Sequence, residues 1–434
     1  MDSYSVREKD IYKTSRIMYI LEAAFEYFIT LATSGAYLAK LTTSIGISDS
    51  MTAILTAITS LVGVFQVVSV FLAHHTPVKR WVIPSQLATN LMFAFLYLIP
   101  LLNLKRGAAL LFFILMLCAG ALKNISTPVK LSCRINLVED KKRGQFYAIL
   151  NNVSLVGSMI YTLIISAIID RFDREENLRS AFIALTLIIF SLAILHALTL
   201  LLAKEKKVET DRNLSSLKSI KHLFSNKKFR RILIINVLFI VASNITNPFL
   251  GTYQINELGF SLTFIAVVDI VLTVMRVLTI YLFGRLSTRK TFVSIEMMSY
   301  NFLFIAYIFL VFTTRANGMV VYTIYKILSL INTSARSVSS TNIIFDIVPQ
   351  KEHASAIAFN SLLIGVIGFV TTLVFSPLVD YIQARGNTFL GIDVFAQQVL
   401  AAISSLIVLI LILYYRICCK SLFDRQDAKE DSSV

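Results

Sequence analysis

Apolar residues fill twelve long stretches of this chain, and short polar segments separate them. A transmembrane helix needs about 20 mainly apolar residues, and the stretches have roughly this length. The pattern therefore predicts an all-α integral membrane protein with twelve spanning helices. The predicted spans are residues 17–39, 51–73, 81–102, 107–127, 144–169, 180–203, 231–254, 261–283, 291–313, 319–345, 353–379 and 395–418.

The composition excludes the main soluble classes. Hydrophobic residues make up 56% of the 434 positions and charged residues only 15%, whereas soluble domains carry about 25% charged residues. A soluble enzyme, a disordered chain and a disulfide-stapled secreted fold are therefore disfavoured. No metalloprotease, esterase or phosphate-loop motif occurs, so the protein is not expected to be an enzyme. The four cysteines lack zinc-ligand spacing, and neither a metal nor a cofactor is expected.

Basic residues are distributed unevenly between alternate connections. Of the 41 Lys and Arg residues, 29 lie on the side of the two termini and 8 on the other side. Cytoplasmic segments of membrane proteins are enriched in these residues, so both termini are predicted to be cytoplasmic. The cytoplasmic segments then account for the net charge of +15, and no nucleic acid is expected as a partner. We expect a monomer in the plasma (cell) membrane, with lipids and a small-molecule substrate as partners.

The chain divides into two halves that resemble each other in order. A six-span bundle is predicted for residues 1–203, a basic cytoplasmic linker for 204–230, and a second six-span bundle with a short tail for 231–434. Val138 and Lys141 in the first half match Val348 and Lys351 in the second, 210 positions later. Duplicated six-span halves with a site near the midplane are a known plan of secondary transporters.

One cytoplasmic loop carries a recognisable motif. The segment Gly284-Arg285-Leu286-Ser287-Thr288-Arg289-Lys290 resembles the signature Gly-x-x-x-Asp-Arg-x-Gly-Arg-Arg of the major facilitator superfamily, with Thr288 in the place of Asp. The first-half copy is eroded, because Ala73 replaces the glycine. The resemblance covers nearly the whole chain. It implies alternating access, a central cavity lined by spans one, four, seven and ten, and gating roles for Gly284, Arg285, Arg289 and Lys290.

Charged residues inside spanning helices are costly and normally mark function. In the first span Glu22, Glu26, Thr30 and Thr33 are spaced by four, four and three residues, which places them on one helix face. Glu26 lies near mid-membrane and is the first candidate for proton coupling, followed by Glu22. Lys123 in the fourth span is predicted to pair with Glu22.

The second half has polar spans of its own. Asp269 in the eighth span lies at a depth similar to that of Lys326, and Arg276 at a depth similar to that of Glu296, so two ion pairs are predicted. Asp269 is the third candidate for proton coupling. His196 is expected to be a lone packed or pore-edge histidine. The remaining substrate-cavity candidates of this half are Asn236, Asn244, Asn247, Lys326, Asn332 and Arg336; Thr30, Thr33 and Lys123 are their counterparts in the first half.

These features together predict a secondary active transporter that moves a small polar solute by alternating access. Acids and bases occur in similar numbers among the cavity candidates, which suits a sugar, a zwitterion or an organic anion moved by symport with H+ as the coupling ion. Two alternatives stay open. One is an efflux pump for amphipathic, drug-like compounds, which the 31 Phe and 17 Tyr would suit. The other is a receptor or scaffold of the same fold that binds a solute without moving it.

Overall fold

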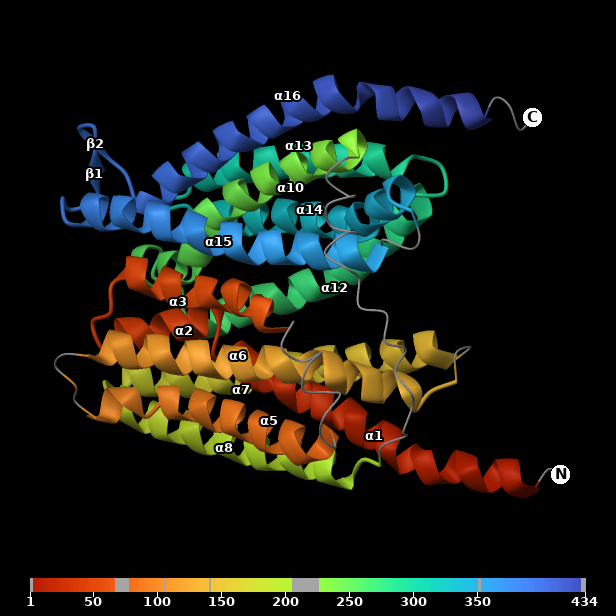
Figure 1. Cartoon of the computed structure of the whole chain (residues 1–434). Helices are drawn as coiled ribbons and strands as arrows, with labels where there is room; N and C mark the ends of the chain where they lie inside the picture. The colour runs from red at the N-terminus through yellow and green to blue at the C-terminus, as the bar shows by residue number, and fades with distance from the viewer. Residues whose placement is uncertain are drawn as a thin grey trace. The chain divides into compact units, whose positions relative to one another are not determined.

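The computed structural model describes residues 3–66, 78–102, 104, 107–139, 142–204, 226–349 and 353–430, and nearly all of them are helical (Figure 1). A two-stranded hairpin, β1 (Thr388–Phe389) and β2 (Ile392–Asp393), is the exception among these residues. The predicted all-α fold is therefore confirmed. Residues 205–225 of the predicted linker, and 73–77 of the first-half signature, lie outside the described part.

The helices divide into two compact units. Unit 1 contains the residues up to Asp211 together with Phe260–Val267, and unit 2 contains Arg212–Gly259 and the residues from Val268 onward. The helices of unit 1 are α1 (Ser3–Ala32), α2 (Gly35–Thr43), α3 (Asp49–Leu61) with the 3₁₀ turn η1 (Val62–Phe65), α5 (Val78–Leu96), η2 (Ile99–Leu102), α6 (Ala108–Asn136), α7 (Arg143–Arg174) and α8 (Leu178–Leu202).

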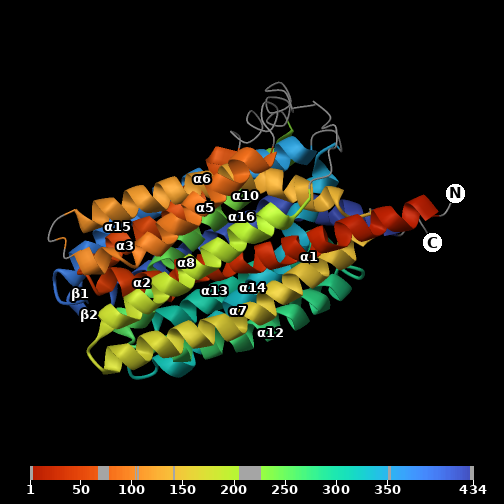
Figure 2. The same cartoon turned by 90° about the horizontal axis from the view of Figure 1, so that it is seen from below.

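Unit 2 repeats the same succession of helices. Its elements are α10 (Lys227–Thr246), η4 (Asn247–Phe249), α11 (Leu250–Thr252), the π-helical turn η5 (Tyr253–Glu257), α12 (Leu262–Leu286), α13 (Phe292–Val311), α14 (Gly318–Ile347), α15 (His353–Gln383) and α16 (Ala396–Glu430). The first residues of α12 belong to unit 1 and the rest to unit 2. Within each unit the helices run side by side as a bundle (Figure 2).

Membrane-spanning character follows from length and apolarity. Among the described residues, eight helices are long and apolar enough to cross a membrane, and the pair α1–α2, bent by 42°, makes a ninth. The helix α3 with η1 is shorter, since the predicted second span continues into residues outside the described part. The helix α14 is long enough, but hydroxyl, amide and charged side chains occupy much of it. Together with α5, which has 19 residues, these helices agree with twelve spans.

Each unit contains the same buried contact at equivalent positions. The hydroxyl of Tyr97 donates to the carbonyl of Ala32 in unit 1, and the hydroxyl of Tyr307 donates to that of Ala242 in unit 2. Both members of the second pair lie 210 positions after those of the first. Each tyrosine is almost completely buried. The same tyrosine therefore ties the third span to the first in both units, which confirms the predicted duplication.

Packing in unit 1 brings the first, fifth and sixth spans together. The helix α1 packs against α7 and α8, and α5 packs against α6 and α8. A glycine permits the closest approach between α1 and α7, because a Cβ at Gly157 would lie 2.5 Å from the ring of Phe28. These contacts hold the polar face of α1 against α6 and α8, where the charged side chains of this unit meet.

Candidate functional site

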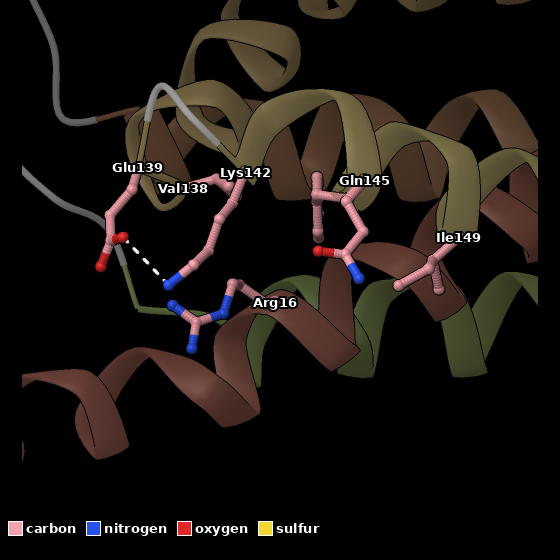
Figure 3. Close-up of a pocket in the computed structure, with 7 residues that line it drawn as sticks. Arg16, Val138, Glu139, Lys142, Gln145 and Ile149 are labelled. Carbon is pink, nitrogen blue, oxygen red and sulfur yellow. Dashed lines mark ion pairs between the residues drawn. The ribbon is translucent and has the colours of Figure 1, made fainter.

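A cleft of about 300 Å³ opens beside the N-terminal part of α1, at the connection between α6 and α7. Arg16, Lys142 and Gln145 line it, and Lys142 is paired with Glu139 at 3.1 Å (Figure 3). None of the residues predicted to bind substrate or protons contributes to this cleft. The candidate site is therefore found elsewhere, among the buried charged residues of each unit.

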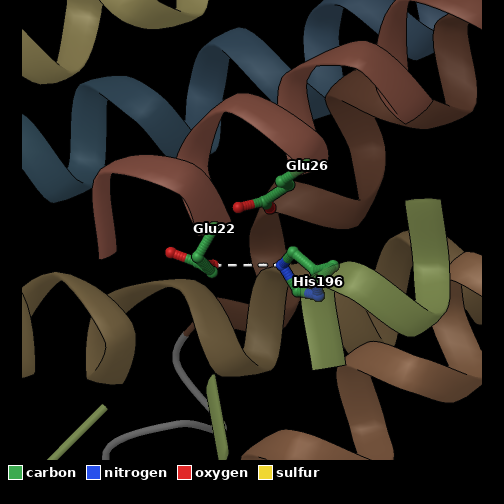
Figure 4. Close-up of side chains that lie close together, drawn as sticks. All are labelled: Glu22, Glu26 and His196. Carbon is green, nitrogen blue, oxygen red and sulfur yellow. Dashed lines mark hydrogen bonds and ion pairs between the residues drawn. The ribbon is translucent and has the colours of Figure 1, made fainter. Parts of the chain in front are cut away.

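The charged side chains of unit 1 come from three helices. The helix α1 supplies Glu22 and Glu26, one turn apart, and α6 supplies Lys123, Lys130 and Arg134 at spacings of seven and four residues. Both spacings place side chains on one helix face. The histidine of α8 completes the group, and Figure 4 shows it pointing toward the two carboxylates. We call these five residues and His196 the unit 1 network.

Glu22 is the buried centre of the unit 1 network. Its side chain is 0% exposed. One carboxylate oxygen accepts from Lys130 Nζ at 3.1 Å, and the other accepts from Nη2 of Arg134. A buried carboxylate is tolerated only when charged or polar donors replace its lost water. Glu22 meets this requirement entirely within the protein.

Glu26 lies at the more accessible end of the network. Its side chain is 17% exposed, and its Oε2 accepts from Lys130 Nζ at 2.7 Å. Lys123 Nζ lies 3.8 Å from Oε1, and Arg134 Nη2 lies 3.8 Å from Oε2. Lys130 therefore bridges the two carboxylates, whereas Lys123 approaches only Glu26. The prediction that Lys123 pairs with Glu22 is wrong, because Lys130, two turns further along the same face of α6, occupies that position.

His196 is part of the network rather than a lone packed histidine. Its side chain is 0% exposed, and Nε2 lies 3.1 Å from Glu22 Oε1. Its other ring nitrogen, Nδ1, lies 3.2 Å from the amide nitrogen of Asn90. An amide nitrogen can only donate, so Nδ1 accepts and the Nε2 proton faces Glu22. This arrangement satisfies a neutral imidazole at both nitrogens.

The network does not resemble a metal site. Glu22, Glu26 and His196 each offer a ligand atom within 4.8 Å of the others. However, Lys130 and Arg134 hydrogen-bond to the oxygens that a metal would need. A divalent cation would have to displace two fixed cations at the same point. The donor set therefore favours proton and anion chemistry over cation binding.

Unit 2 holds a second buried cluster around Arg336 of α14. Its guanidinium lies over the ring of Phe239, 3.3 Å from the centroid. Its Nε is 3.6 Å from Glu296 Oε1, and its Nη2 donates to Asn236 Oδ1 at 3.4 Å. Asn236 in turn donates to Asn360 at 3.0 Å. The cluster therefore joins Asn236 and Arg336, two of the predicted cavity residues from the seventh and tenth spans.

The predicted ion pairs of unit 2 have different outcomes. Lys326 Nζ lies 2.9 Å from Asp269 Oδ1, which confirms that pair. The predicted pair between Arg276 and Glu296 is wrong, because Glu296 faces Arg336 and accepts from Tyr300 at 2.7 Å. A similar expected depth in the membrane does not determine which neighbouring helix supplies the partner.

Several other predicted residues make contacts inside their own unit. Thr30 accepts from Lys123 Nζ at 2.7 Å and so extends the unit 1 network. Thr33 bonds to the carbonyl of Ile29 at 3.1 Å, and Asn244 bonds to that of Ile240 at 2.9 Å. Asn332 is buried and donates to the carbonyl of Ser299 at 2.9 Å. The polar side chains of Thr33 and Asn244 therefore bond to carbonyls four residues earlier, and that of Asn332 in α14 bonds to a carbonyl of α13.

The remaining candidates lie near helix ends. Asn247 is exposed where α10 ends and η4 begins. Gly284 and Arg285 lie in the last turn of α12, followed by Arg289 and Lys290 in the connection to α13. Within the described part of the chain, no ion pair joins Arg285, Arg289 or Lys290 to an acidic residue. Their gating role stays a prediction.

Sequence reasoning missed Lys130 and Arg134, and it expected His196 to stand apart from the charged residues. The apolar stretch ends at residue 127, so Lys130 and Arg134 were assigned to a cytoplasmic segment, whereas α6 continues to Asn136. The available signal was the face that they share with Lys123, at spacings of seven and four residues. Removing them from the cytoplasmic basic residues leaves 27 against 8, so the predicted orientation is unaffected.

Comparison with known proteins identifies the family. Residues 21–372 match the family model described as Major Facilitator Superfamily. The match covers most of the chain, and the protein therefore belongs to this superfamily of multi-pass membrane transporters. No curated protein matches the sequence at a significant level.

Solved structures share the fold at low sequence identity. A mutant of the nucleoside transporter NupG has a TM-score of 0.74 at 12% identity, covering 93% of this chain and 99% of that chain. A bacterial homologue of the human lysosomal transporter Spinster, inward-facing and unoccupied, has 0.67 at 13%, covering 98% of both. A D-xylose-proton symporter has 0.66 at 13%, covering 92% and 96%. These likenesses establish a transporter fold.

Proposed function

We propose that the protein is a secondary active transporter that moves a small polar solute by alternating access, coupled to protons at Glu26. The family and the fold support a transporter rather than an enzyme. A D-xylose-proton symporter is among the similar structures, which makes proton coupling compatible with this fold. We place the protein in the plasma membrane with both termini cytoplasmic, because Lys and Arg are concentrated in the connections on the side of the termini.

The observation that carries the proposal is the contrast between the two carboxylates of the unit 1 network. Glu22 is fully buried and has two cationic donors and a histidine around it. Glu26 is 17% exposed, and two of its three cation contacts are long, at 3.8 Å. Glu26 can therefore exchange a proton with water, whereas the complete burial of Glu22 prevents this exchange. Glu22 serves as the fixed acceptor that holds Lys130 and Arg134 in place.

Protonation of Glu26 changes the contacts between α1 and α6. A neutral Glu26 no longer attracts Lys130 Nζ, now 2.7 Å away, or Lys123 Nζ, now 3.8 Å away. One of the two charged links between these helices then weakens, while the link through Glu22 persists. Protonation of Glu26 thus weakens one contact between α1 and α6 and leaves the other intact. Such a local change can shift the balance between two conformations of the protein.

Transport into proteoliposomes tests the proposal. Ligands are first found by thermal shift, since a ligand at 100 times its Kd stabilises the folded state by about 2.7 kcal/mol. Uptake of each ligand is then measured with and without a pH gradient. Accumulation that requires the gradient supports the proposal. Binding without uptake in either direction would identify a receptor, and accumulation without any response to pH would exclude proton coupling.

A further inference from the structure

We infer that the transported solute carries a negative charge, and that Lys123 is the residue that meets this charge. This inference rests on the proposed transport function and narrows its substrate class from a polar solute to a small organic anion. It follows from an imbalance of charge in the unit 1 network, where three basic side chains face two carboxylates.

Among the described residues, no acidic side chain other than Glu22 and Glu26 forms an ion pair with Lys123, Lys130 or Arg134. His196 of α8 lies between Glu22 and Asn90 of α5 and adds no negative charge. Tyr147 of α7, which faces Arg134, is a phenol and carries no charge at neutral pH. The network therefore has a net charge of one positive unit when both carboxylates are ionised. Protonation of Glu26 raises this excess to two.

Lys123 is the lysine of the network whose positive charge is less completely neutralised. Lys130 is 3% exposed and has a carboxylate oxygen at 2.7 Å and another at 3.1 Å. Lys123 is 25% exposed and has Thr30 Oγ1 at 2.7 Å, with its nearest carboxylate at 3.8 Å. Lys130 is enclosed by two carboxylates, whereas the nearest carboxylate to the more exposed Lys123 is 3.8 Å away, so Lys123 is the better placed of the two to bind an anionic partner. Its greater exposure leaves room for that partner.

The two carboxylates considered in the spans of unit 2, Asp269 and Glu296, are each paired within their own unit. Asp269 is paired with Lys326 at 2.9 Å, and Glu296 lies 3.6 Å from Arg336. Each of these pairs is balanced by itself. Arg276 is exposed on α12 and adds positive charge. An incompletely neutralised ammonium in a low-dielectric site is unfavourable, and an anionic solute would relieve this imbalance.

The charge balance also predicts how the transport cycle responds to voltage. One proton on Glu26 and one monovalent anion at Lys123 enter together with no net charge. Uptake should therefore follow the pH gradient and be insensitive to the membrane potential. A neutral solute moved with a proton would instead carry one positive charge per cycle.

The decisive experiment measures uptake into proteoliposomes of purified full-length protein. The probes are labelled small monocarboxylates, the neutral amides of the same acids, sugars and nucleosides. A potassium gradient with valinomycin sets the membrane potential independently of pH. We expect carboxylates alone to accumulate, with rates that change less than twofold when the potential is imposed. Proton-driven uptake of a neutral solute with strong voltage dependence would overturn the inference and leave the proposed function intact. Absence of any proton-driven uptake would overturn both.

Variants of Lys123 assign the anion to this residue. Lys123→Gln should raise the KM for the carboxylate about tenfold or more, as expected for one lost charge-assisted contact. Lys123→Arg keeps the charge and should stay within about threefold of the wild type. Lys40→Gln is the matched control, because Lys40 is paired with Asp173 on other helices of the same unit. An unchanged KM for Lys123→Gln would contradict the assignment.

Discussion

At the residue scale, Lys123 and Lys130 lie on the same face of α6 but differ strongly in burial. Lys130 is 3% exposed and bridges Glu22 and Glu26, whereas Lys123 is 25% exposed and touches one carboxylate only at 3.8 Å. Removing one partner of a buried ion pair leaves an uncompensated charge, which is more damaging than losing an exposed pair. The two lysines should therefore differ in structural importance.

Lys130→Met should lower the free energy of unfolding by about 3–5 kcal/mol, because the fully buried Glu22 loses a cation. Lys123→Met should lower it by about 1 kcal/mol or less, in line with more exposed pairs. Thermal melting of the purified variants in detergent measures the difference. In the double variant Lys130→Met/Glu22→Gln the losses should be less than additive. Equal losses for the two lysines would contradict the burial argument.

The sequence was sufficient for part of this site. Charged residues in an apolar helix are conspicuous, so Glu22, Glu26 and Lys123 could be found, and their helical spacing placed them on inward faces. Their partners could not be assigned in the same way. Partner choice depends on helix rotation and on where a helix ends, and neither follows from an apolar stretch. The cations of α6 that reach Glu22 are therefore Lys130 and Arg134 rather than Lys123.

At the element scale, close helix approach in unit 1 depends on glycines. A Cβ at Gly157 of α7 would lie 2.5 Å from Cζ of Phe28 on α1. The ring of Phe28 is in turn stacked on Tyr161, with centroids 5.2 Å apart, so it is not free to move aside. This contact holds α1, the helix that carries both carboxylates, in its position beside α7.

Gly157→Ala should destabilise the protein by about 1–3 kcal/mol, the usual cost of overpacking a tight core. Gly63→Ala is the control, because a Cβ there has no atom within 4 Å. The control should leave stability unchanged or raise it slightly, since alanine restricts the unfolded chain. Melting temperatures of the two variants, measured side by side, check the prediction. Equal melting temperatures would show that Phe28 can yield.

The ends of the elements were predicted less well than their existence. Hydropathy located each span because the bilayer selects apolar residues over about 20 positions. The helix α6 runs nine residues past its predicted end, and the first span is broken into α1 and α2 at Ser34 and Gly35. Gly35 has a φ of 55°, a conformation that glycine adopts readily. Hydropathy carries no signal for such a break.

At the scale of the whole molecule, the two units share a scaffold and differ in chemistry. Asn236 of α10 lies 210 positions after Glu26 of α1, so an amide occupies the place of the carboxylate proposed to couple protons. Glu296 and Arg336, which face each other in unit 2, occupy the places of Gln86 and Ser126, which are hydrogen-bonded in unit 1. Equivalent positions therefore carry different chemistry in the two units: an amide in place of a carboxylate in one case, and an ion pair in place of a neutral hydrogen bond in the other.

The orientation of the whole chain is tested by accessibility labelling. In a variant without the four native cysteines, Asp173→Cys and Arg315→Cys should react with an impermeant maleimide in intact cells. Lys142→Cys and Lys290→Cys should react only after permeabilisation, because the basic connections are predicted to be cytoplasmic. Labelling in the reverse pattern would place both termini outside and contradict the predicted orientation.

The central claim is that Glu26 couples proton movement to solute movement. Glu26→Gln, which resembles the protonated side chain, is compared with Glu175→Gln, a control in the exposed pair with Arg171. Reconstituted protein is assayed for solute exchange at equal pH and for accumulation driven by a pH gradient. We predict that Glu26→Gln retains exchange and loses gradient-driven accumulation, while Glu175→Gln retains both. Accumulation by Glu26→Gln at the wild-type level would contradict the claim.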